Sequence, residues 1–408
     1  MKTQVVITGI GMVSSLGIGK AQTWEAIRNN KHGIKIRKDW PEYDAGSQYF
    51  GESVPFNLRD YIKLKPPFPN YYSQMGLLAT YMALQDSKLD ISKMEPFDVG
   101  CIMNTCFGSN ESVEKYLMKL FEKGPGKVSP LTFTQTTNNH IVGDIARYYN
   151  IKGPNTIVMG EDSYSLGIKC IRNNQAKVML CGGVDQIRDL RLYILNENNE
   201  LLDPVFESPD SLFTKKAQKR SMNKYIIGEA ACFIILEDKT HAIERRAHIY
   251  AEITDPVTYN DLDASRSFVN RNEKVLEDLI KKSVSKAEID VNQIDMLIGS
   301  STLPWLMNSY ELKTMKKLNI NSIYTSILSR IGECFGASGS FSLATSAMAI
   351  NENFVPGCGY HPDFFSDVKE GIIIPNEGFN KKDLNCVAVH SIHIGGSSSC
   401  TLLKKPQF

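Results

Sequence analysis

The chain has 408 residues, which is enough for one large α/β unit or for two fused halves. Its 46 Lys and Arg residues balance 45 Asp and Glu residues, and the resulting formal charge of +1 argues against nucleic acid or an anionic membrane as a partner. No apolar run approaches the roughly 20 residues that a membrane span needs. We therefore expect a soluble, cytoplasmic protein.

The cysteine and glycine patterns argue against a disulfide framework, a zinc site and a dinucleotide-binding site. The nine cysteines are odd in number, lie mostly in apolar runs and form no C-x-x-C pair, which is typical of reduced, buried thiols rather than of disulfides or a zinc site. A dinucleotide fingerprint would need a third glycine where Ser14 stands, after Gly9 and Gly11. We expect no metal and no cofactor.

In chain order, the apolar run from Val5 predicts a first strand, since glycines interrupt it and no signal-peptide cleavage site follows. Residues 40–69 lack clean periodicity and predict a surface excursion. A core helix is predicted within 75–90. Residues 111–122 predict an amphipathic helix, whose apolar face contains Val113, Tyr116, Leu117, Leu120 and Phe121.

Residues 153–185 are the most informative stretch. An apolar run at 156–159 turns sharply at Gly160, a helical segment follows at 163–173, and a second apolar run ends in two glycines. This pattern predicts a strand, an elbow, a helix and another strand, with Asp162 at the elbow. Enzymes often place a nucleophile at such a position, because the helix N-terminus favours an anion.

The remaining chain alternates again between strand and helix patterns. Residues 188–219 are polar and predict a loop-rich surface. Helices are predicted over 273–286, 309–318 and 340–349, and strands over 294–300, 386–392 and 399–405.

Several of these segments together resemble the β-ketoacyl synthases. T-G-I-G-M-V-S-S-L-G is similar to the family's opening, G-P-N with V-M-L-C-G-G-V-D resembles its active-site segment, and G-E-A-A-C-F-I-I-L-E resembles its G-E-G-A-G-V-L-V-L-E block. The resemblance covers essentially the whole chain. It implies an α/β, thiolase-like (ketosynthase) fold of two similar α/β halves, residues 1–250 and 251–408, in a layered α-β-α-β-α arrangement. The first half would hold the elbow and a dimerisation loop at about 129–155.

The same resemblance shows that the catalytic positions are substituted. Asp162 takes the place of the acyl-carrying cysteine, Ile298 and Glu333 those of two histidines, and Leu328 that of a lysine. Ile394 stands at the position of a gating phenylalanine. Without a thiolate and its oxyanion donors this site cannot condense. Glu333 near Asp162 would also put negative charge, or a shared proton, where an anion must develop.

Around the elbow, V-M-G-E-D-S is similar to the corresponding segment of chain-length factors, the non-condensing partners of ketosynthases in bacterial type II polyketide synthesis. That resemblance implies a heterodimer with an active ketosynthase, a shaped polyketide tunnel and an acyl carrier protein bearing the polyketide on phosphopantetheine. The tunnel candidates are Phe133, Tyr116, Leu117, Leu120 and Phe121. For the four helical residues, the alternative is the core face of an amphipathic helix.

Two other functions stay open at this point. One is a non-catalytic homodimeric scaffold for carrier proteins; the other is an unusual enzyme, such as a malonyl-carrier decarboxylase or acyl hydrolase, using Asp162, Glu333 or Cys334. We interpret Cys334 as a buried, inert thiol. His140 and His393 are interpreted as structural, since the sequence pairs neither with a carboxylate or a nucleophile.

Overall fold

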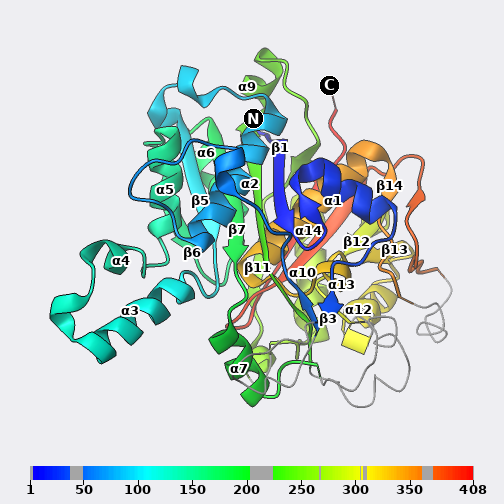
Figure 1. Ribbon diagram of the computed structural model, residues 1–408. Coiled ribbons are helices and arrows are strands. Elements are labelled where there is room, and N and C mark those ends of the chain that lie inside the picture. Colours follow the sequence, from blue (N-terminus) through cyan, green and yellow to red (C-terminus); the bar gives the residue numbers. More distant parts are fainter. Residues whose placement is uncertain are drawn as a thin grey trace.

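The computed structural model describes residues 3–36, 49–202, 224–265, 268–303, 305–306, 310–360 and 371–407. Strands and helices alternate along most of this chain (Figure 1). The strands are β1 (Val5–Ser14), β2 (Gly17–Ile18), β3 (Lys35–Ile36), β4 (Tyr49–Gly51), β5 (Val99–Asn104), β6 (Asn155–Val158), β7 (Val178–Asp185), β8 (Ile227–Gly228), β9 (Ala230–Asp238), β10 (Ala251–Ile253), β11 (Val257–Asn260), β12 (Met296–Ile298), β13 (Ile323–Thr325), β14 (Phe354–Val355), β15 (Phe379–Asn380), β16 (Cys386–Ile392) and β17 (Ser397–Lys404). The helices are α1 (Gly19–Arg28), α2 (Tyr71–Ser87), α3 (Asn110–Lys123), α4 (Pro130–Thr134), α5 (His140–Tyr149), α6 (Ser163–Arg172), α7 (Asp189–Glu197), α9 (Lys239–Glu244), α10 (Glu273–Lys286), α12 (Glu311–Lys317), α13 (Leu328–Ile331) and α14 (Ser338–Glu352).

The largest sheet repeats one topology twice. Its main order is β13-β12-β16-β17-β10-β1-β9-β7-β5-β6. In the first ladder β6, β5 and β7 are parallel, and β9 and β1 continue it antiparallel. In the second, β13, β12 and β16 are parallel, and β17 and β10 continue it antiparallel. If the five strands of each ladder are numbered by their order along the chain, both ladders have the strand order 3-2-4-5-1. This repeated order confirms the two similar halves. The boundary at residue 250 stays a prediction.

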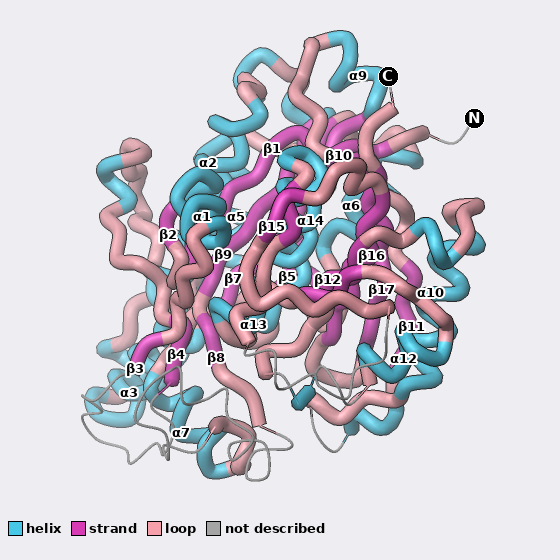
Figure 2. Tube along the Cα trace, turned by 90° about the vertical axis from the view of Figure 1, so that its right-hand side faces the viewer, coloured by secondary structure: helices cyan, strands magenta, loops and turns pink. Residues whose placement is uncertain are grey.

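Helices form layers on both sides of the two ladders. Alternate residues of β9 face opposite sides: Phe233 and Ile235 pack with α2, whereas Ile234 and Leu236 belong to the cluster that holds residues of α6 and α14. In α14, all residues from Ser338 to Ile350 are buried, as in a helix covered on every side. It packs against β9 and β16, one strand from each half. α10 packs on β11 and β17 and against α12. Figure 2 shows α10 and α12 on the right, on the opposite side of the molecule from α1 and α2.

Several predicted elements are confirmed. β1 is buried along its whole length, and its glycines have a packing reason, because a Cβ on Gly11 would lie 1.9 Å from the Ala79 carbonyl oxygen of α2. The helix predicted over 273–286 has the bounds of α10. The nine cysteines are free, and eight of them are buried. Among the described residues, no helix is both long and apolar enough to cross a bilayer.

Two loop predictions are wrong in part. Within the stretch 40–69, residues 40–48 lie outside the described chain, but Tyr49–Gly51 form buried β4, which pairs with β3 and β8. Within 188–219, Asp189–Glu197 form α7, whose Leu192 and Leu195 are buried; residues 203–219 lie outside the described chain. In both places tertiary packing outweighs a polar local composition.

Candidate functional site

The turn between β6 and α6 forms the elbow. Gly160 has a φ of 71°, a left-handed conformation that glycine adopts without strain. Asp162 is the N-cap residue of α6, but its carboxylate makes no capping hydrogen bond to the helix. An aspartate at this position usually accepts a hydrogen bond from the first turn. Here the side chain bonds to the second half of the protein instead.

Three groups surround the Asp162 carboxylate. The Ser399 hydroxyl donates to Oδ2 at 2.5 Å, and Nε2 of His393 lies 3.5 Å from Oδ1. Gly339 leaves room for the carboxylate, because a Cβ there would lie 2.1 Å from Oδ1. Burial raises the pKa of Asp162, but His393 and the hydroxyl donors outweigh burial and hold that pKa below its ordinary value. The elbow therefore presents an ionised carboxylate that is already bonded.

Glu333 lies in the loop between α13 and α14. Its Oε1 accepts hydrogen bonds from the Phe335 N–H at 2.7 Å and from the Ser338 hydroxyl at 2.6 Å. Burial raises the pKa of Glu333 to about 7, against the lowering effect of these donors and of His393. Beside Glu333 is a cavity of about 10 Å³, close to the minimum for one water molecule. Each of the two carboxylates has its own donors, and no hydrogen bond joins them in the described chain, so the shared proton is not borne out.

The other substituted positions offer no polar group. Ile298 ends β12 and Leu328 begins α13, and both are buried in the core. Neither side chain can donate a hydrogen bond to a thioester or an enolate. Ile394 lies in the turn between β16 and β17 and is 41% exposed. The structure therefore brings Asp162 close to the hairpin that carries Ile394, through His393 and Ser399.

The sequence did not reveal the partners of the two histidines. His393 lies beside Asp162, and Nε2 of His140 lies 3.2 Å from Oδ2 of Asp144, four residues along α5. Each histidine therefore has a carboxylate neighbour that the sequence did not pair with it, and its interpretation as structural stays a prediction. The i, i+4 spacing could have revealed the pair on α5, whereas nothing local links position 393 to the elbow.

A second buried polar centre was also missed. Glu311, the first residue of α12, accepts hydrogen bonds from the Ser300 N–H at 2.8 Å and the Ser301 hydroxyl at 2.9 Å, and it lies 2.6 Å from Nδ1 of His390. Burial raises the pKa of Glu311, but the interaction with His390 and these donors outweighs burial and lowers it overall. These contacts fix the loop after β12, which lines the cavity beside Glu333.

The predicted tunnel residues lie on an arm formed by α3 and α4. Figure 1 shows these helices projecting from the body at the left. Tyr116 and Phe133 contact each other at 5.6 Å between ring centroids. Phe121 is 81% exposed and Phe133 is 55% exposed, and Leu117 is exposed as well. The alternative of a core face is wrong for Leu117 and Phe121, because this face of α3 is not covered by the described chain.

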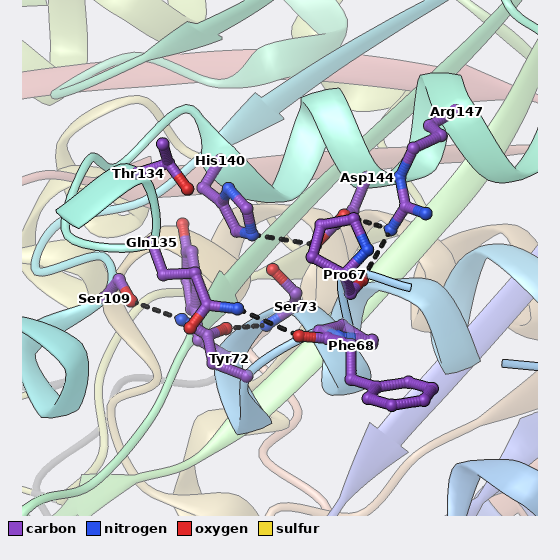
Figure 3. A network of polar contacts seen from close by, with 12 residues as sticks. Pro67, Phe68, Tyr72, Ser73, Ser109, Thr134, Gln135, His140, Asp144 and Arg147 are labelled. Carbon is purple, nitrogen blue, oxygen red and sulfur yellow. Dashed lines mark hydrogen bonds and ion pairs between the residues drawn. The ribbon is translucent and has the colours of Figure 1, made fainter. Parts of the chain in front are cut away.

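The base of the arm is fastened to α5. Arg147 donates to the Pro67 carbonyl at 3.0 Å and to Asp144 at 2.9 Å, and Gln135 donates to the Phe68 carbonyl at 2.9 Å (Figure 3). The Gln135 bond ties the segment before α2 to the segment that follows α4, and the bond from Arg147 to Pro67 ties the segment before α2 to α5. The arm therefore projects from a well-bonded base.

Comparison with protein families decides the relationship. Residues 2–242 match the N-terminal domain of β-ketoacyl synthases, and residues 250–359 match the C-terminal domain. This chain belongs to the β-ketoacyl synthase family.

Curated relatives and solved structures agree with this assignment. The chain is 25% identical over 432 residues to 3-oxoacyl-[acyl-carrier-protein] synthase 2 of Coxiella burnetii, covering 99% of each chain. It is 25% identical over 418 residues to the protein of the same name from Staphylococcus aureus strain COL, covering 98% of each. A structure described as the ishigamide ketosynthase/chain length factor superposes with a TM-score of 0.86 at 19% identity, with both chains fully covered. A structure described as a type II PKS acyl-carrier protein in complex with its ketosynthase superposes with a TM-score of 0.83 at 20% identity, again with both chains fully covered. These structures establish the thiolase-like fold.

In this β-ketoacyl synthase family member, neither of the two candidate thiols, Cys170 and Cys334, lies at the elbow. Cys170 lies two turns further along α6, and burial raises its pKa. Cys334 is fully buried, and burial together with the Glu333 charge raises its pKa well above 9. Thiolates are the reactive form of cysteine, so these raised pKa values disfavour reactivity of both side chains.

Proposed function

We propose that this chain is a non-condensing ketosynthase-like subunit, a chain-length factor. It pairs with an active ketosynthase and shapes the tunnel in which a polyketide grows on an acyl carrier protein. One observation carries the proposal: the elbow of a ketosynthase fold holds Asp162, bonded to Ser399 and beside His393, in place of a nucleophile.

The chemistry of the centre supports a silent subunit. Covalent acyl transfer needs a thiolate, and each lost oxyanion donor costs about 3–4 kcal/mol of transition-state stabilisation. Decarboxylation of a malonyl group would develop an enolate near Asp162, whose lowered pKa keeps it negatively charged. Like charges oppose that step. The geometry therefore favours neither condensation nor decarboxylation.

Two surfaces support pairing with another chain. β6 ends the large sheet, and its Asn155 and Thr156 are exposed, so its outer edge offers backbone groups to an added strand. The arm adds an exposed apolar surface, formed by Leu117, Met118, Phe121, Leu131 and Phe133. Apolar side chains grouped in this way mark an interaction site.

The partner is tested by purification of the tagged full-length chain from its native host. We expect a stoichiometric ketosynthase with an intact Cys-His-His set, in a complex of heterodimer size. A stable homodimer without a ketosynthase would overturn the proposal and favour a carrier-protein scaffold. The purified complex then supplies the material for product assays.

The arm is tested by Phe133→Ala in the reconstituted synthase. Loss of this exposed ring is expected to lengthen the polyketide or broaden its length distribution, because the ring would limit tunnel depth. The control is Phe97→Ala, which removes a ring that is 61% exposed and lies outside the arm. Product lengths are measured by mass spectrometry, and an unchanged distribution for Phe133→Ala would contradict the role of this residue.

A further inference from the structure

Four aromatic rings meet beside the small cavity that Glu333 lines. Phe335 contacts Phe107 at 4.6 Å between ring centroids, Phe268 at 5.8 Å and Tyr225 at 6.0 Å. Tyr225 and Phe268 also contact each other at 5.4 Å, and both line the cavity beside Glu333. We name these four residues the aromatic plug. It combines residues from both halves of the chain.

Phe335 has an unusual backbone conformation. Its φ is 47°, in the left-handed region that bulky side chains rarely adopt. Two hydrogen bonds hold the turn: the Phe335 N–H donates to Oε1 of Glu333 at 2.7 Å, and the Gly336 N–H donates to Oδ2 of Asp185 at 2.8 Å. Strained conformations persist where the surrounding structure over-determines them, and they cluster at functional sites.

Phe107 is held by the same aspartate. Its N–H donates to Oδ1 of Asp185 at 2.9 Å, and the Arg191 guanidinium lies 3.1 Å from the centroid of its ring. Asp185 thus binds the loop after β5 and the loop after α13 with one carboxylate. The rings of Phe107 and Phe335 meet because both loops are fixed to this group.

We propose that the aromatic plug closes this chain's own centre against acyl chains, and that Glu333 positions it by holding Phe335 in the left-handed conformation. Within the described chain, the space left beside Glu333 is about 10 Å³, whereas ligand pockets measure about 300–1,000 Å³. The consequence for synthesis rests on the proposed function: a growing polyketide would have only the partner's centre and the shared tunnel to enter. The closure itself does not depend on that function.

The closure is tested on the full-length chain with benzene as the probe, because emptied apolar cavities bind it. Saturation-transfer NMR is expected to detect no saturable binding to the parent protein. Phe335→Gly, and Phe107→Ala as a second opening variant, are expected to bind benzene at least tenfold more tightly. Binding by the parent as tight as by both variants would overturn the closure. Phe97→Ala serves as the control for loss of an exposed ring.

The positioning role of Glu333 has its own readouts. Glu333→Ala is expected to admit benzene although all four rings are present, whereas Glu333→Gln keeps an oxygen for the Phe335 N–H and is expected to exclude it. Phe335→Gly is also expected to melt at a higher temperature than Phe335→Ala, since glycine suits a positive φ. The opposite order of melting temperatures, or equal benzene binding by the two Glu333 variants, would overturn this role.

The two proposals fail separately. If the purified chain has no ketosynthase but the benzene results hold, the plug stands and the chain-length function falls. If the chain controls product length while the parent protein binds benzene freely, the function stands and the plug falls.

Discussion

Glu333 makes the stability of the protein depend on pH in a direction that can be measured. Its pKa rises from an ordinary 4.5 to about 7 on folding, because the carboxyl group is buried. Since the folded state has the higher pKa, this group's stabilisation is complete below about pH 4.5 and is lost as the pH rises through about 7. At about 1.4 kcal/mol per pKa unit, the loss is about 3 kcal/mol.

Glu333→Gln isolates this effect, because the amide oxygen can still accept hydrogen bonds but the side chain does not titrate. The variant is expected to gain about 2–3 kcal/mol in the free energy of unfolding relative to the parent between pH 5 and pH 8, because part of the loss has already occurred at pH 5. Urea unfolding followed by tryptophan fluorescence measures this difference, from which the titrating groups that do not interact with Glu333 cancel. A difference that stays constant across the range would refute the reasoning. Ser338→Ala removes a donor to the ionised carboxylate and is expected to move the transition to higher pH.

Three further predictions concern the elbow. His393→Gln is expected to lower the free energy of unfolding by about 3 kcal/mol, because it leaves the buried Asp162 carboxylate without its histidine neighbour. In an Asp162→Asn background the same substitution is expected to cost less than about 1 kcal/mol. Equal costs in the two backgrounds, measured by urea unfolding, would exclude a coupling between the two side chains. Gly339→Ala places a Cβ 2.1 Å from the Asp162 carboxylate and is expected to cost about 1–3 kcal/mol in thermal denaturation. Gly143→Ala on α5, where a Cβ meets nothing within 4 Å, is its control and is expected to be neutral or stabilising. Asp162→Cys restores a thiol but not the lost donors, so the isolated chain is expected to remain at least about a thousandfold below a ketosynthase in a condensation assay; activity near that of a ketosynthase would contradict this account of the centre.

Local sequence patterns were sufficient to predict an element where its formation depends on its own residues. The helix at 273–286 and the elbow at Asp162 follow from apolar spacing and from glycine at a turn. β4 could not be predicted in this way, because its three residues are a strand through pairing with two other short strands, β3 and β8, and β8 lies far along the chain. α7 depends in the same way on burial of Leu192 and Leu195 against distant segments.

The candidate site shows the same limit. Motif positions identified Asp162 and Glu333, but not what surrounds them, since Ser399 lies 237 residues from Asp162 along the chain. Periodicity also could not decide between a core face and an exposed face for α3. An amphipathic helix has the same apolar spacing whether its own domain or another chain covers it, and only the structure shows Phe121 uncovered.

The position of β1 has a consequence for biosynthesis. This first strand lies in the middle of the sheet, where Val5 pairs with Asp238 of β9 and with Ile253 of β10. During translation at about 5–20 residues per second, residue 238 follows residue 5 by roughly 10 to 50 s. For that time an apolar strand that is buried at all ten positions in the native state lacks β9 and β10 beside it, and only its last two residues can pair with a strand, β2. Because unpaired apolar strands are prone to aggregate, we expect this strand to be exposed to aggregation until the middle of the protein has been made.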